Sequence, residues 1–196
     1  MATIDRIGFG QVEPNHLSAQ ITGQIYAQLP ADDFDILENG MFVKYDYTAG
    51  KIDLTGDGEW MLVFNEVKLY DDRWRESYKD FAMIKTNYTS DTVPAWAPRP
   101  AEIISHDGVT LKGQMVPRVF KTNVGDIFTT NCLEKGNTSG SATVTGSDDL
   151  SVGSVLAPNA NGFLETTTST DGMLWKVVKI YKLADGQDAV KIQRVQ

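Results

Sequence analysis

The chain has 196 residues, with 26 acidic and 18 basic side chains and a formal net charge of −8. This length predicts one domain or two small lobes, and the excess negative charge disfavours a nucleic-acid partner, whose phosphates repel it. The single cysteine, Cys132, excludes an internal disulfide and a zinc site built from thiolates. No apolar run reaches the roughly 20 residues that a spanning helix needs, so we expect no membrane partner.

Residues 1–30 carry few charges and contain glycines and prolines among scattered apolar side chains. Their spacing fits neither a helix nor a long strand, which predicts an extended N-terminal arm. The arm packs either on its own domain or on another subunit, and both alternatives stay open. The second alternative makes its apolar side chains candidate contacts with a partner protein, together with a tryptophan that lies between prolines. These candidates are Ile4, Ile7, Phe9, Leu17, Ile21, Ile25, Tyr26 and Trp96.

Residues 31–90 predict a first β lobe, because apolar side chains alternate over 41–46 and 60–65 around a Gly-Asp-Gly turn signal. The stretch Asp71 to Ile84 predicts a helix within this lobe, about residues 71–84. Acidic residues suit its first turn, and aromatic side chains recur on one face.

Residues 91–100 hold three prolines and predict a stiff connector between lobes. Residues 101–196 predict a C-terminal β-barrel-like lobe. Its strongest strand pair runs over 173–183 and 189–195, joined by an Asp-Gly turn at Asp185. The fold class is therefore mainly β, with small β-barrel or sandwich lobes, one short α-helix and the extended N-terminal arm.

A weak internal repeat begins at Gly40, Gly125 and Gly153. Each glycine precedes a short apolar stretch that ends in Asp or Asn. The pattern predicts a tight glycine turn that leads into a short strand and stops at a turn capped by the Asx side chain.

The sequence contains no nucleophile elbow, phosphate-binding loop or zinc-protease motif. His106 beside Asp107 fits ordinary turn chemistry better than catalysis, and Cys132 is predicted to be buried and inert. Asp53 to Glu59 is similar to the start of a calcium loop, but the twelfth position holds Phe64 where a glutamate is needed. A solvated turn is therefore preferred over a calcium site at Asp53 and Asp57. We predict no catalytic residues, no metal and no cofactor.

Three stretches are similar in style to the capsid decoration (cement) proteins of tailed bacteriophages: Glu38–Val43, Val124–Asn131 and Gly172–Tyr181. The resemblance implies a non-enzymatic virion protein that binds the outer face of the head, bridges neighbouring major capsid subunits and stabilises the shell. It implies the major capsid protein and copies of the chain itself, as a trimer or dimer, as partners. It also implies assembly in the cytoplasm of a host bacterium.

Two other functions remain open at this stage. One is a different phage virion component in the tail, neck or head fibre. The other is a carbohydrate-binding surface module that uses exposed aromatic side chains and polar loops.

Overall fold

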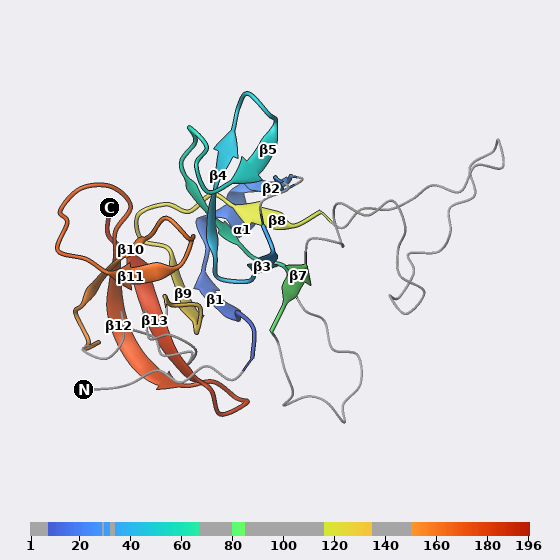
Figure 1. Ribbon diagram of the computed structural model, residues 1–196. Coiled ribbons are helices and arrows are strands. Elements are labelled where there is room, and N and C mark those ends of the chain that lie inside the picture. The colour runs from blue at the N-terminus through green and yellow to red at the C-terminus, as the bar shows by residue number, and fades with distance from the viewer. Residues whose placement is uncertain (1–7, 29, 32–33, 67–79, 85–115, 135–149) are drawn as a thin grey trace, which may run out of the picture.

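The computed structural model describes residues 8–28, 30–31, 34–66, 80–84, 116–134 and 150–196. They form three antiparallel sheets and one five-residue helix, α1 (Ser18–Thr22) (Figure 1). The six-stranded sheet has the order β1 (Val12–His16), β9 (Ile127–Thr130), β13 (Asp188–Arg194), β12 (Trp175–Lys182), β10 (Val155–Pro158) and β11 (Leu164–Thr166). The five-stranded sheet has the order β2 (Ile25–Ala27), β8 (Arg118–Phe120), β6 (Trp60–Val63), β4 (Phe42–Asp46) and β5 (Lys51–Asp53). The two-stranded sheet pairs β3 (Ile36–Glu38) with β7 (Ala82–Ile84). The prediction of a mainly β fold is confirmed.

Glycines with positive φ start many of these strands, as the internal repeat predicted. Gly40, Gly125 and Gly153 have φ values of 92°, 99° and 95°, and β4, β9 and β10 each begin two residues later. The Asx turn follows in two of the three copies. Asp46 accepts backbone N–H groups from the turn after β4, and Asn159 does the same after β10. In the third copy, the side chain of Asn131 instead accepts the N–H of Gln11 in a distant segment.

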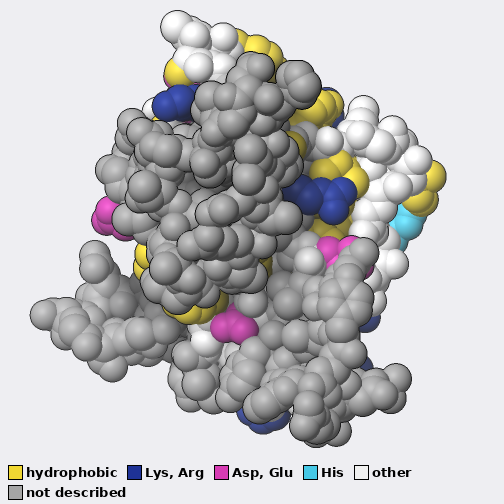
Figure 2. Space-filling view, turned by 90° about the vertical axis from the view of Figure 1, so that its right-hand side faces the viewer, with side chains coloured by type: hydrophobic (Ala, Val, Ile, Leu, Met, Phe, Trp, Pro, Cys, Tyr) yellow, Lys and Arg dark blue, Asp and Glu magenta, His cyan; other side chains and the backbone are white. Residues whose placement is uncertain are grey.

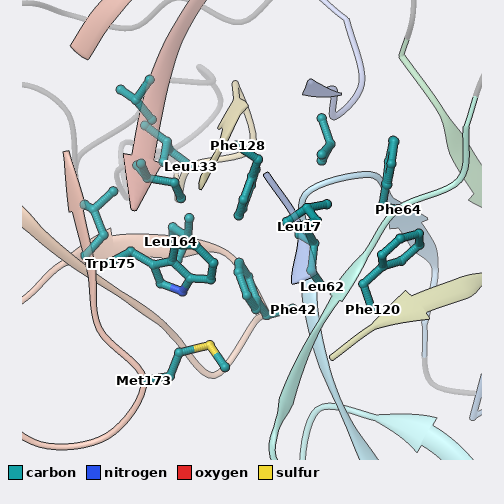
Figure 3. Packing of buried hydrophobic residues seen from close by; sticks show 14 of the residues in the cluster. Leu17, Phe42, Leu62, Phe64, Phe120, Phe128, Leu133, Leu164, Met173 and Trp175 are labelled. Carbon is teal, nitrogen blue, oxygen red and sulfur yellow. The ribbon is translucent and has the colours of Figure 1, made fainter. Parts of the chain in front are cut away.

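The two large sheets share one hydrophobic core. Phe42 of the five-stranded sheet packs against Phe128 and Trp175 of the six-stranded sheet, with ring centroids 6.5 and 5.7 Å away (Figure 3). All three side chains are fully buried. A second cluster on the opposite face of the five-stranded sheet includes Val43 and Met83, and the two-stranded sheet covers it.

The sheets divide the chain differently from the predicted lobes. β8, which lies after residue 101, is hydrogen-bonded between β2 and β6 in the five-stranded sheet. β1, from the predicted arm, pairs with β9 at the edge of the six-stranded sheet. The boundary between lobes is therefore wrong as a division of the fold, because apolar strands from both halves are needed to cover the shared core. The predicted connector, residues 91–100, lies outside the described residues.

Residues 8–27 pack on their own chain. β1 is the edge strand of the six-stranded sheet, and β2 is the edge strand of the five-stranded sheet. Leu17, which lies between β1 and β2 along the chain, is only 2 % exposed. Of the two alternatives for the predicted arm, the described residues therefore follow the one in which it packs on its own domain. Gly23 ends α1 in the left-handed conformation, and Pro14 lies within β1, where the register to β9 shifts.

The predicted helix 71–84 is wrong at its C-terminal end. Ala82–Ile84 form β7, whose register places Met83 opposite Leu37 of β3, and both side chains are buried. Pairing buries Met83 while Ile84 stays half-exposed, which is the alternation of a strand. Residues 71–79 lie outside the described part of the chain.

The predicted C-terminal hairpin is confirmed as β12 and β13. Its register shifts between Val177 and Lys179, so Val178 is an extra residue and its side chain is 44 % exposed. The bulge leaves Val178 and Lys179 both exposed in succession along β12.

Candidate functional site

A cavity of about 340 Å³ opens on one face of the five-stranded sheet, beside the smaller core cluster. The strand register places Tyr26, Met61 and Tyr45 on this face, on β2, β6 and β4 respectively. The cavity is lined by Tyr26, Gln28, Tyr45, Tyr47, Gly58, Glu59, Met61 and Lys121. We call this the tyrosine pocket.

Two of the tyrosine rings meet at a right angle. The rings of Tyr45 and Tyr47 have centroids 4.9 Å apart and an interplanar angle of 81°, an edge-to-face arrangement. Tyr47 is 73 % exposed and Tyr26 is 42 % exposed. Met61, by contrast, is 8 % exposed. The pocket therefore has a buried apolar floor and aromatic walls that remain in contact with solvent.

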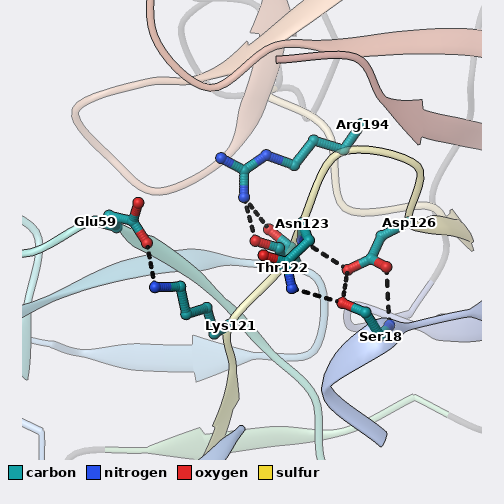
Figure 4. A network of polar contacts seen from close by, with 7 residues as sticks. All are labelled: Ser18, Glu59, Lys121, Thr122, Asn123, Asp126 and Arg194. Carbon is teal, nitrogen blue, oxygen red and sulfur yellow. Dashed lines mark hydrogen bonds and ion pairs between the residues drawn. The ribbon is translucent and has the colours of Figure 1, made fainter. Parts of the chain in front are cut away.

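Among the described residues that line the pocket, Glu59 and Lys121 are charged, and they form an ion pair. The ammonium group of Lys121 lies 3.2 Å from a carboxylate oxygen of Glu59, and both side chains are solvent-accessible (Figure 4). The two charges cancel, and each group still presents hydrogen-bonding atoms to solvent. Gln28 adds an amide that donates and accepts.

A polar network next to the pocket fixes α1 to the loop between β8 and β9 (Figure 4). The buried carboxylate of Asp126 accepts three hydrogen bonds, from the backbone N–H of Ser18, the Ser18 hydroxyl and the backbone N–H of Asn123, at 2.8, 2.9 and 2.8 Å. The side-chain amide of Asn123 donates to the Ser18 hydroxyl at 2.8 Å. α1 has no side-chain N-cap of its own, so Asp126 performs that role from another segment.

Arg194, at the end of β13, donates from its guanidinium to the carbonyl and hydroxyl oxygens of Thr122. Burial lowers the pKa of this guanidinium, and the nearby carboxylates of Glu59 and Asp126 oppose the shift. Arg194 therefore connects the polar network with the charged side of the tyrosine pocket.

Three exposed apolar side chains lie close in sequence to residues of the polar network. Ile21 of α1 is 77 % exposed, and Val124 beside Asn123 is 68 % exposed. Val195 follows Arg194, whose backbone bonds to both Gly125 and Asp126, and it is 44 % exposed. We call Ile21, Val124 and Val195 the apolar corner. It is assembled from three segments that are distant in sequence and are held by backbone and buried polar bonds.

A second polar network holds the start of the described chain. Gln11 donates to the carboxylate of Asp185, and Gln187 accepts the N–H of Gly8 and bonds to Asn131. Burial acts to raise the pKa of Asp185, but hydrogen bonds from Gln11 and Gln187 outweigh it and hold the pKa below its usual value. Residues 8–11 are therefore attached to the β12–β13 turn.

The predicted contact residues do not gather at one surface. Leu17 is buried, so its prediction as a partner contact is corrected: it fills the core between the two sheets. Ile25 is partly buried against the same core. Phe9, Ile21 and Tyr26 are exposed, at a second cavity, the apolar corner and the tyrosine pocket respectively. Ile4, Ile7 and Trp96 lie outside the described residues.

The structure also shows the surroundings of Asp53, a residue of the calcium-like loop, and of the single cysteine, Cys132. The carboxylate of Asp53 accepts the backbone N–H groups of Thr55 and Gly56, which is the geometry of an Asx turn. Cys132 is buried in the smaller core cluster, as predicted. Within the described ranges, no group of three or more His, Cys, Asp or Glu side chains is placed to hold a metal ion. The longest helix there, α1, has five residues and is too short to cross a membrane.

Of the residues that line the tyrosine pocket, only Tyr26 was among the contact residues predicted from the sequence. Trp175 is fully buried, and Trp60 packs partly against the core with the ammonium group of Lys44 4.8 Å from its ring centroid. The signal for the pocket was Tyr45 and Tyr47 at the end of a strand, where alternate side chains share a face. Figure 2 shows hydrophobic side chains of the described residues at several separate places on one face of the molecule.

Comparisons with protein-family models, with curated proteins and with solved structures find no match to this chain.

Proposed function

We propose that the chain is a non-enzymatic structural protein of a tailed-phage virion, which binds the outer face of the head and bridges neighbouring capsid subunits. The observation that supports the proposal is the apolar corner. Ile21 and Val124 expose most of their side chains, and the buried Asp126 network joins the two segments that carry them. An apolar surface held in one shape loses little conformational entropy when a protein partner covers it.

Four acidic side chains have structural partners within the described residues. Asp46 and Asp53 cap turns, Asp126 caps α1, and the buried Glu38 accepts the backbone N–H of Gly10 at 2.7 Å. Of these carboxylates, Asp126 joins two of the segments that carry the corner, through Ser18 and Asn123. We propose the major capsid protein and further copies of this chain as partners, on assembly in the bacterial host.

The proposal is tested on purified particles of the phage that carries the gene. An antibody against the chain should label the head, and cryo-electron microscopy should place its density across contacts between capsid subunits. Label confined to the tail or neck, or no chain in the particles, contradicts the proposal.

Variants at the corner test the surface itself. The double variant Ile21→Asp with Val124→Asp should lower binding to heads that lack the chain at least tenfold, because a charge in an apolar contact must be desolvated without a partner. Val152→Asp is the matched control: Val152 is 65 % exposed in the turn before β10, two strands from β13. Equal binding of the double variant and wild type contradicts a role for the corner.

A further inference from the structure

The tyrosine pocket has the size and chemistry of a small-ligand site. Its volume of about 340 Å³ falls in the range of such sites, and it combines an apolar floor with a few polar groups. Tyr26, Tyr45 and Met61 come from β2, β4 and β6, and the other described lining residues come from the segments directly beside these strands and after β8. We propose that this pocket binds a neutral saccharide unit. The proposal goes beyond the capsid role and does not depend on it.

The aromatic geometry favours a sugar ring over a flat ligand. A planar base or aromatic compound stacks best against one ring or between parallel rings, but the rings of Tyr45 and Tyr47 stand at 81° to each other. A pyranose ring has apolar C–H faces and hydroxyl groups around its edge. It can place one face on an exposed tyrosine and direct its edge along the neighbouring ring.

The polar groups of the pocket are suited to hydrogen bonds with the hydroxyl groups of a sugar. A sugar hydroxyl both donates and accepts, and it can bond to the Glu59 carboxylate and the Lys121 ammonium at once, because these groups lie 3.2 Å apart. Gln28 and the tyrosine hydroxyls supply further donors and acceptors. Since the charges of Glu59 and Lys121 cancel, the described residues that line the pocket carry no excess positive charge for a phosphate or carboxylate.

The test is a titration of the full chain with maltotetraose, cellotetraose and chitotetraose. Saturation-transfer difference NMR and calorimetry measure the binding. Trigalacturonic acid and adenosine serve as the anionic and flat comparisons. We expect saturable binding of at least one neutral oligosaccharide, with transfer strongest at the ring protons. Absence of saturable binding by all three, or binding of only the anionic or flat compound, overturns the proposal.

Variants assign the binding to this pocket. Tyr47→Ala should weaken it at least tenfold, whereas Tyr47→Phe, which keeps the ring, should stay within about threefold of wild type. Folding should survive both changes because Tyr47 is 73 % exposed. Phe9→Ala is the control, an exposed aromatic at the second cavity. Binding that is unchanged in Tyr47→Ala, or lost equally in Phe9→Ala, contradicts the assignment. Head binding measured on the same variants separates this result from the capsid proposal.

Discussion

Gly40 and Gly125 have nearly the same backbone conformation in very different surroundings. Both have φ above 90° and precede a strand by two residues. A Cβ atom on Gly125 would meet no atom within 4 Å, whereas one on Gly40 would lie 2.5 Å from the Cβ of Cys132 and 2.6 Å from the Thr130 hydroxyl. Both positions of the repeat therefore need a residue that adopts positive φ. Gly40 also needs a residue without a Cβ atom, because its neighbours leave no space for one.

This difference predicts the outcome of two alanine substitutions. Gly125→Ala should destabilise the protein by about 1–2 kcal/mol, the cost of a left-handed conformation for a residue with a Cβ. Gly40→Ala should cost about 2–5 kcal/mol, because overpacking against Cys132 adds roughly 1–3 kcal/mol to the same strain. Urea unfolding of the two variants measures both values. Equal losses of unfolding free energy in the two variants would show that the side chains around Cys132 move to accept the added Cβ atom without a loss of stability.

At the scale of elements, α1 illustrates how a segment too short to be stable alone is held in place. Five residues make little more than one turn, and such a helix is marginal in water. Ala19 and the N-cap residue Leu17 are buried, and the backbone N–H and hydroxyl of Ser18 donate to Asp126 across more than a hundred residues of sequence. Tertiary contacts, rather than local propensity, therefore determine this helix.

Asp126→Ala should destabilise the protein by about 3 kcal/mol or more, because it removes three hydrogen bonds to a buried carboxylate and leaves their donors without an acceptor. Asp126→Asn should lose less stability than Asp126→Ala, because the side-chain amide oxygen still accepts hydrogen bonds. Asp57→Ala, at an exposed aspartate, is the control for the change in charge. Thermal and urea unfolding measure all three, and a loss in Asp126→Ala no larger than in Asp57→Ala contradicts this role.

At the scale of the whole molecule, the sequence predicts local features well and long-range pairings poorly. Strand alternation and glycine turns depend on neighbouring residues, so β4, β6 and the β12–β13 hairpin follow from the pattern. The insertion of β8 between β2 and β6 depends on contacts across about ninety residues of chain, and no local period encodes it. The tyrosine pocket has the same origin, because Tyr26 and Lys121 come together only through that pairing.

Both halves of the chain contribute strands to the five-stranded sheet, and the two large sheets share one core. We therefore expect the two sheets to unfold as one cooperative unit. Phe42 on the five-stranded sheet contacts Phe128 and Trp175 on the six-stranded sheet, so loss of its ring should weaken both. We expect Phe42→Ala to cost about 3–5 kcal/mol, and amide hydrogen exchange of β6 and β13 to accelerate by the same factor.

Ile21→Ala, at a side chain 77 % exposed, is the control and should leave both exchange rates within about twofold of wild type. Two independent lobes give a different result. In that case Phe42→Ala accelerates exchange in β6 and leaves β13 protected, because each lobe opens without the other. The core of Phe42, Phe128 and Trp175 joins the sheets directly, and for that reason we expect a single transition in which neither sheet survives the loss of the other.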